Sequence, residues 1–140
     1  MVMEQLAVEI VGLCREYGEC RVEAERMEEA RRVKNALESV CSMARQRLDI
    51  SDPALLLALL DACEVTRDEG MLQEVLDVVG RNLDRLAVSA ESVKLLACCY
   101  YYVEEEECVE RAGRMLEELR KMGRGEEELA DAETILEELT

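Results

Sequence analysis

The spacing of the apolar residues constrains the fold more than any other feature of this chain. Apolar side chains recur every three or four positions almost from end to end, as in the run Met27, Ala30, Val33, Leu37, Val40, Ala44 and Leu48. This spacing gives an α-helix, which has about 3.6 residues per turn, one apolar face. Only one residue in 140, Pro53, is proline, the strongest breaker of helices. The sequence therefore predicts an all-α protein.

Turn signals divide the chain into six or seven helices, stacked as antiparallel hairpins in a solenoid or a bundle. The expected hairpins span about 3–48, 53–86 and 89–122, and a capping helix spans about 126–139. Gly18 is expected to end the first helix, because glycine adopts the left-handed conformation at little cost. Pro53 suits the first position of the third helix, after a cap at Ser51 or Asp52. No change in composition marks a boundary, so residues 1–140 are expected to form one domain.

Two further helix starts are predicted from capping residues. Residues 66–69 (Thr-Arg-Asp-Glu) match a capping box, in which Thr66 would cap the fourth helix. Ser89 is expected to cap the fifth. Residues 103–107 contain neither Gly nor Pro, so the turn before the sixth helix is placed only by analogy with Thr66. A continuous helix through this segment is the alternative.

The second and third hairpins read as two copies of one unit, about 37 residues apart. The shift superimposes Leu59 on Leu96, Cys63 on Tyr100, Val75 on Ala112 and Val79 on Leu116. A repeated helical hairpin of this length is typical of α-solenoids. Over residues 53–123 the chain resembles tetratricopeptide repeat domains, which prefer a bulky residue at Leu96 and Leu116 and a small one at Ala112. It departs from them at Tyr100, where the family has Gly or Ala, and in lacking their repeat-ending proline. The resemblance implies a groove that binds a peptide or protein.

The charge balance indicates which partners the chain attracts. It has 33 acidic and 17 basic residues, a net charge of −16. Such a surface repels phosphate backbones and attracts basic proteins, so direct binding of nucleic acid is disfavoured. No apolar run reaches the roughly 18 residues that span a membrane, and the first residues lack the positive charge of a secretory signal. We expect a cytoplasmic protein that does not enter membranes.

The composition also argues against catalysis. The chain has no His, which excludes nucleophilic sites of the Ser-His-Asp and Cys-His types. No Gly-rich phosphate loop is present, and the cysteine spacings match no zinc motif. The glutamate runs are expected to be solvated helix surface. The sequence therefore predicts no enzyme, no cofactor and no metal.

The seven cysteines are the most unusual feature of the composition. In an ordinary cytosol they would be reduced and buried. The excess of Arg over Lys and the scarcity of Asn and Gln are typical of heat-adapted proteins, in which intracellular disulfides persist. Cys14 and Cys20 flank Gly18, and a disulfide between them would hold the first two helices together if their Cα atoms lie within about 7 Å.

Two groups of residues are candidates for contact with a partner. Tyr100, Tyr101 and Tyr102 form the only aromatic cluster. Three consecutive helical residues cover most of the circumference, so one or two should be exposed, although packing in the core is the alternative. Arg31, Arg32 and Lys34 form the main basic cluster. They could contact a partner or form ion pairs with glutamates one turn away.

These observations favour a non-enzymatic protein-interaction module, acting as an adaptor or assembly subunit through an acidic helical surface. Two alternatives stay open. A small helical subunit of a ribonucleoprotein or other nucleic-acid complex would act through its second helix, expected over about 21–48, and through its protein neighbours. A homo-oligomeric structural protein would pair the long apolar seam of residues 27–48 with that of a second copy.

Overall fold

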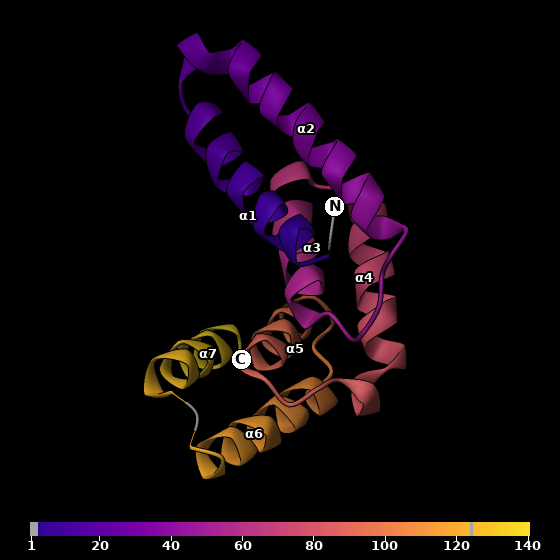
Figure 1. Cartoon of the computed structure of the whole chain (residues 1–140), viewed down its shortest axis with the longest axis vertical. Helices are drawn as coiled ribbons and strands as arrows, with labels where there is room; N and C mark the ends of the chain where they lie inside the picture. The colour runs from indigo at the N-terminus through magenta and orange to yellow at the C-terminus, as the bar shows by residue number, and fades with distance from the viewer. Residues whose placement is uncertain (1–2, 124) are drawn as a thin grey trace.

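The computed structural model describes residues 3–123 and 125–140 and contains only helices there, which confirms the all-α prediction (Figure 1). In chain order they are α1 (Met3–Cys20), the short 3-10 helix η1 (Ala24–Arg26), α2 (Met27–Arg45), α3 (Pro53–Thr66), α4 (Glu69–Arg81), the 3-10 helix η2 (Leu83–Arg85), α5 (Ala90–Val103), α6 (Glu106–Lys121) and α7 (Glu126–Leu139).

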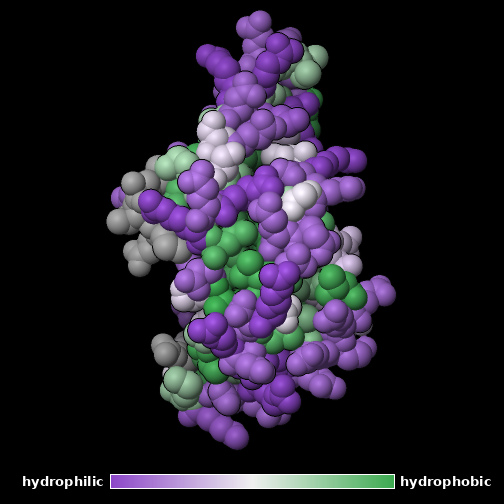
Figure 2. Space-filling model, turned by 90° about the vertical axis from the view of Figure 1, so that its right-hand side faces the viewer, coloured by the Kyte–Doolittle hydropathy of each residue, from purple (hydrophilic) through white to green (hydrophobic). Residues whose placement is uncertain are grey.

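The helices pack in antiparallel pairs that follow one another along the chain. α2, α4 and α6 each fold back on the odd-numbered helix before them, and α1, α3 and α5 each contact the next odd-numbered helix. The pair α1–α2 forms one end of the elongated molecule, and α6 and α7 form the other (Figure 1). The side on which α4 lies is mostly hydrophilic, with a hydrophobic area near its middle (Figure 2). The result is the stack of helical hairpins that the sequence predicts.

The core lies mainly on α3 and α5, the two odd-numbered helices with another odd-numbered helix on either side. On α3 the buried residues are Leu55, Leu56, Ala58, Leu59, Leu60, Ala62 and Cys63. A helix with apolar residues around most of its circumference needs several packing partners, and α3 obtains them from α1, α2, α4 and α5. This helix therefore lies at the centre of the stack. Among its apolar residues, Pro53, Leu57 and Val65 are half-buried, and Ala54 is exposed.

The two central hairpins repeat with a period of 37 residues in structure as well as in sequence. α3 and α5 are both 14 residues long. Their caps are Asp52 and Ser89, whose side chains each accept a hydrogen bond from a backbone N–H of the first turn. Both helices end on a non-glycine residue in the left-handed region, Arg67 (φ 58°) and Glu104 (φ 53°). The repeated unit therefore includes its caps and its turn.

Glu104 also settles the boundary between α5 and α6. Its left-handed conformation interrupts the helix, and its N–H donates to the carbonyl of Tyr100 over 2.8 Å, which closes the last turn of α5. α6 begins two residues later. The turn is at the predicted place, and the alternative of a continuous helix is wrong.

Four other helix ends differ from the predictions. α1 continues through Gly18 to Cys20. α2 begins at residue 27 rather than 21, after η1, and ends at 45 rather than 48. α4 ends at Arg81 rather than 86, although Leu83 and Leu86 are buried. Leu83 belongs to η2 and Leu86 is the residue after it. Buried apolar residues at helical spacing therefore continue past the end of α4.

The predicted capping box at Thr66 is wrong. Thr66 is the last residue of α3, and its hydroxyl donates to the carbonyl of Ala62 over 2.8 Å. Such a bond to the preceding turn is a common use of a helical threonine. Asp68 caps α4 instead, since its Oδ1 accepts from the N–H of Met71 over 3.0 Å. The cap of α4 therefore lies two residues later in the chain than predicted.

Candidate interaction surface

The exposed faces of α1, α3 and α5 enclose a groove of about 420 Å³, which we call the valine groove. Its lining residues are Ala7, Val8, Val11, Gly12, Arg15, Ala54, Leu57, Ala58, Asp61 and Glu91. The groove exists because α1 packs beside α3 and α3 beside α5. It lies on the odd-numbered helices of the stack.

The lining of the valine groove is largely apolar and open to water. Val8 is 74% exposed and Val11 39% exposed, and Leu57 is half-buried. A Cβ added at Gly12 would meet no atom within 4 Å, so no neighbouring side chain fills the space above it. Each square ångström of apolar surface removed from water contributes about 25 cal/mol. A partner that covered these side chains would therefore bind with a more favourable free energy, and no part of the protein would have to move to admit it.

Charged groups line the same groove beside this apolar surface. Asp61 and Glu91 supply carboxylates and Arg15 supplies a guanidinium. Partial burial, and secondarily the carboxylate of Glu64, raise the pKa of Asp61. A cation brought beside Asp61 would lower its pKa again, because a nearby positive charge stabilises the ionised form. The groove therefore combines apolar contact with a preference for positive charge.

A second hollow lies between the C-terminal halves of α3 and α5 and the start of α4, and we call it the tyrosine hollow. It measures about 380 Å³ and is lined by Cys63, Glu64, Arg67, Asp68, Glu69, Leu72, Tyr101 and Tyr102. Tyr102 follows Glu91 by about three helical turns, so the two project from the same side of α5. Glu64 follows Asp61 by three residues on α3. The two hollows are thus successive sites along the same pair of helices.

The structure separates the roles of the three candidate tyrosines. Tyr101 is 62% exposed. Its ring packs edge to face against that of Tyr102, with centroids 5.2 Å apart and planes at 83°. Tyr100 is half-buried against the core. The expectation that one or two of the three reach the surface agrees with this arrangement.

The candidate basic residues lie elsewhere. Arg31 and Arg32 are exposed on α2 and Lys34 is half-buried, in the half of α2 farther from α5 (Figure 1). Glu29 is hydrogen-bonded by Arg26 over 2.9 Å, a contact that lowers the pKa of the carboxyl, with a smaller contribution from Arg32. The structure does not bring the basic and aromatic candidates together.

The predicted disulfide between Cys14 and Cys20 is wrong, since all seven cysteines are free thiols. Both residues lie on α1, which does not end at Gly18. Six residues advance an α-helix by about 9 Å, beyond the reach of a disulfide. Burial raises the pKa of Cys14 to about 11, and those of Cys41 and Cys63 to about 12. Protonated thiols are poor nucleophiles.

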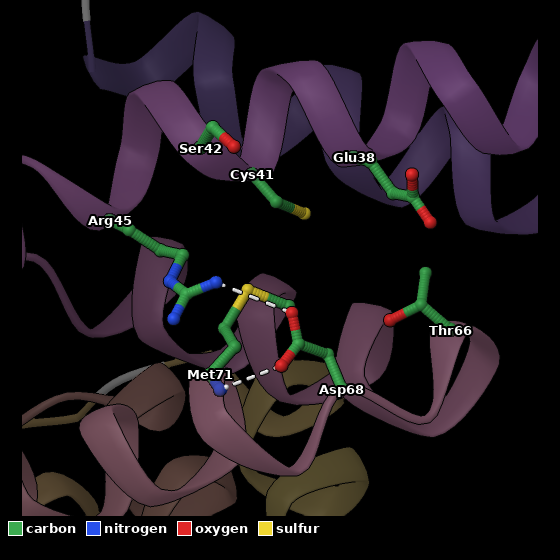
Figure 3. A pocket seen from close by; sticks show the side chains of 7 residues that line it. All are labelled: Glu38, Cys41, Ser42, Arg45, Thr66, Asp68 and Met71. Atoms are coloured by element: carbon green, nitrogen blue, oxygen red, sulfur yellow. Dashed lines mark hydrogen bonds and ion pairs between the residues drawn. The ribbon is translucent and has the colours of Figure 1, made fainter.

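A polar pocket of about 390 Å³ lies where α2 meets the start of α4 (Figure 3). Arg45 of α2 donates through Nη1 to Oδ2 of Asp68 over 3.3 Å, and through Nε to Oε2 of Glu74 over 2.9 Å. Because Asp68 also caps α4, one carboxylate fixes the helix start and ties it to α2. Cys41 lines the pocket with a raised pKa. We interpret the pocket as a structural link between hairpins.

We expect Asp68→Ala to lower the free energy of unfolding by about 1–2 kcal/mol. It removes the cap of α4, worth about 1 kcal/mol, and an exposed ion pair worth less. Asp68→Asn is the control, because asparagine keeps the cap and removes the charge, so it should lose only a few tenths. Urea denaturation measures both. Equal losses for the two variants would show that the ion pair, and not the cap, is the important contact.

The valine groove was not predicted from the sequence, although one signal was available. Val8 and Val11 widen the apolar stripe of α1 beyond what its packing on α2 and α3 covers.

Among the described residues, no group of three or more acidic or cysteine side chains is arranged to hold a metal ion. No helix in that part of the chain is long and apolar enough to cross a membrane. In comparisons with family models, curated proteins and solved structures, nothing matches this chain.

Proposed function

We propose that this protein is a non-enzymatic interaction module that binds a segment of another protein along α1, α3 and α5. The observation that carries the proposal is the valine groove, in which Val8 and Val11 stay exposed beside Leu57. Isolated apolar residues are normal on a surface, whereas apolar side chains from several helices that line one groove are typical of a binding site. The module would act as an adaptor or assembly subunit in the cytoplasm.

The charge of the molecule supports a basic partner. The net charge of −16 attracts positive segments over distances of about 10 Å at ordinary salt. Asp61 and Glu91 place two of these negative charges in the groove itself. Association should therefore slow as salt is added, whereas the apolar contact, which sets the lifetime of the complex, should change less.

The stacked hairpins support a preformed site. α1 is fixed by α2 on one side and by α3 on another, so the groove is in place before a partner arrives. A preorganised surface loses little conformational entropy on binding. In this respect the proposal follows the resemblance to tetratricopeptide repeats, with the odd-numbered helices as the binding face.

The test compares two variants that carry the same change. Val8→Lys introduces a positive charge into the valine groove, whereas Val22→Lys does so at the turn between α1 and α2. Val8 is 74% and Val22 76% exposed, so neither change should disturb the fold. The tagged full chain is used to capture proteins from a lysate of the source cells, with and without nuclease, and they are quantified by mass spectrometry. We expect Val8→Lys to retain about tenfold less of its partner, equivalent to about 1.4 kcal/mol, and Val22→Lys to match the wild type.

The other outcomes are equally informative. Equal capture by both variants would exclude the valine groove as the site. Capture that is lost on adding nuclease would favour a subunit of a ribonucleoprotein. Recovery of this chain alone, with a dimeric mass in solution, would favour a homo-oligomeric structural protein.

A further inference from the structure

We propose that Tyr101, Tyr102 and Glu64 form a receptor for a single cationic side chain, a lysine or arginine of the bound protein segment. This inference rests on the proposed function and deepens it, because it names the chemistry of the partner at a defined point of the surface. The tyrosine hollow lies further along α3 and α5 than the valine groove and can be tested separately.

The two rings supply the first element of the receptor. Their planes meet at 83° with centroids 5.2 Å apart, so they form two walls of a corner. Tyr101 is 62% exposed, which leaves ring surface free for a ligand. The face of an aromatic ring is the negative end of its quadrupole and attracts ammonium and guanidinium groups. Two rings set nearly perpendicular can contact one such group together.

Carboxylates supply the second element. Glu64, Asp68 and Glu69 line the hollow against one guanidinium, that of Arg67. Asp68 already accepts from Arg45, over 3.3 Å, whereas Glu64 lies near enough to Tyr102 to contribute, after burial, to the raised pKa of its phenol. The hollow therefore has an excess of negative charge beside its aromatic walls, which favours a cation and repels an anion.

The remaining wall suits the stem of a long basic side chain. Leu72 and Cys63 contribute apolar atoms to the hollow. Lysine and arginine bury their methylene stems on apolar surface while their charged ends stay at the polar rim. A short or purely apolar side chain could use the stem contacts but would leave the carboxylates without a counter-charge.

The separation of the two hollows predicts a pattern in the ligand. Tyr102 follows Glu91 by about three turns of α5, or roughly 16 Å along the helix. An extended segment advances about 3.3 Å per residue. A segment that lies along α5 would therefore carry its lysine or arginine about five residues from the residue that lies beside Glu91 in the valine groove.

The test uses small probes in place of the partner. The isotope-labelled full chain is titrated with N-acetyl-arginine amide at physiological salt, and the tyrosine ring signals are followed by NMR. The matching citrulline amide has nearly the same shape without the charge. We expect saturable shifts of the Tyr101 and Tyr102 signals with the arginine probe only. Tyr17, which packs between α1 and α2, is the internal control and should not shift.

Two variants then test the elements of the receptor. Tyr101→Leu should weaken binding of the arginine probe about 2- to 30-fold, the range expected for a cation–π contact between exposed and desolvated sites. Glu64→Gln should weaken binding and reduce its dependence on salt. Both residues are exposed, and circular dichroism confirms that the helices are intact. Shifts of Tyr17 in parallel with Tyr101, or equal shifts with citrulline, would overturn the proposal, because either would show diffuse or uncharged binding.

The failures of the two proposals can be distinguished. Val8→Lys changes α1 and should leave the binding of the arginine probe unchanged. If the probe binds but no partner depends on Val8, the valine groove is wrong and the receptor stands. If a partner depends on Val8 while the probe does not bind at the tyrosines, the receptor is wrong and the interaction module stands.

Discussion

Replacing Leu59 by alanine should lower the free energy of unfolding by about 3–5 kcal/mol, the largest effect that we expect of any single substitution described here. Leu59 is fully buried at the middle of α3. Its truncation removes apolar burial and leaves a cavity that rigid neighbouring helices fill only in part. A domain of this size is usually stable by about 5–15 kcal/mol, so the variant would keep at most a small margin. Urea denaturation at neutral pH measures the loss.

Leu57→Ala is the matched control for this prediction. Leu57 lies two residues earlier on the same helix but is half-buried and lines the valine groove. Alanine is at least as good a helix former as leucine, so we expect a loss of about 1 kcal/mol or less. The same variant should weaken partner binding, because it removes apolar surface from the groove. Equal losses of stability at the two positions would contradict the assignment of inward and outward faces on α3.

Raising the pH from 8 to 10 should destabilise the fold by an amount that depends on its buried thiols. Burial raises the pKa of Cys41 and of Cys63 from the ordinary value of 9.0 to about 12. At pH 10 most of these thiols are ionised in the unfolded chain and protonated in the folded one. The folded state then binds more protons, so the free energy of unfolding falls as the pH rises. The loss begins near pH 9 and continues to about pH 12.

At pH 10, one unit above the ordinary thiol pKa, each of these cysteines should contribute about 1 kcal/mol to the loss, so the two together contribute roughly 2–3 kcal/mol. The double variant Cys41→Ala/Cys63→Ala lacks this contribution, although its stability at pH 8 should already be lower because alanine leaves small cavities. The comparison is therefore between the two slopes of stability against pH, measured by urea denaturation under reducing conditions. A slope unchanged in the double variant would show that other groups cause the alkaline destabilisation.

Local signals in the sequence predicted the fold closely. Pro53 after Asp52, and Ser89 before the fifth helix, are residues whose conformation or side chain fits one place in a helix, and both starts are confirmed. The prediction was wrong where two signals compete. Thr66 and Asp68 can both cap a helix, and the choice depends on the left-handed conformation of Arg67 between them. Gly18 permits a helix end without requiring one.

The candidate site was harder to predict because it depends on contacts between distant segments. The apolar stripe of α1 contains Val8 and Val11. The sequence does not show which residues of that stripe are buried by α3 and which stay exposed. The valine groove follows from the packing of α1 on α3 and of α3 on α5. The tyrosines, in contrast, were found from the sequence alone, since three consecutive helical residues cannot all face the core.

The order of packing in the stack has a consequence for how the chain acquires its structure. Each helix contacts chiefly its immediate neighbours in sequence or the helix one step beyond. The loops that must close are therefore short, and closing them loses little entropy, a condition associated with rapid folding. During synthesis, α1 and α2 would already have a partner once α3 has emerged, and each later hairpin would add to a surface that is already formed. The molecule can thus assemble from its beginning without waiting for its last residues.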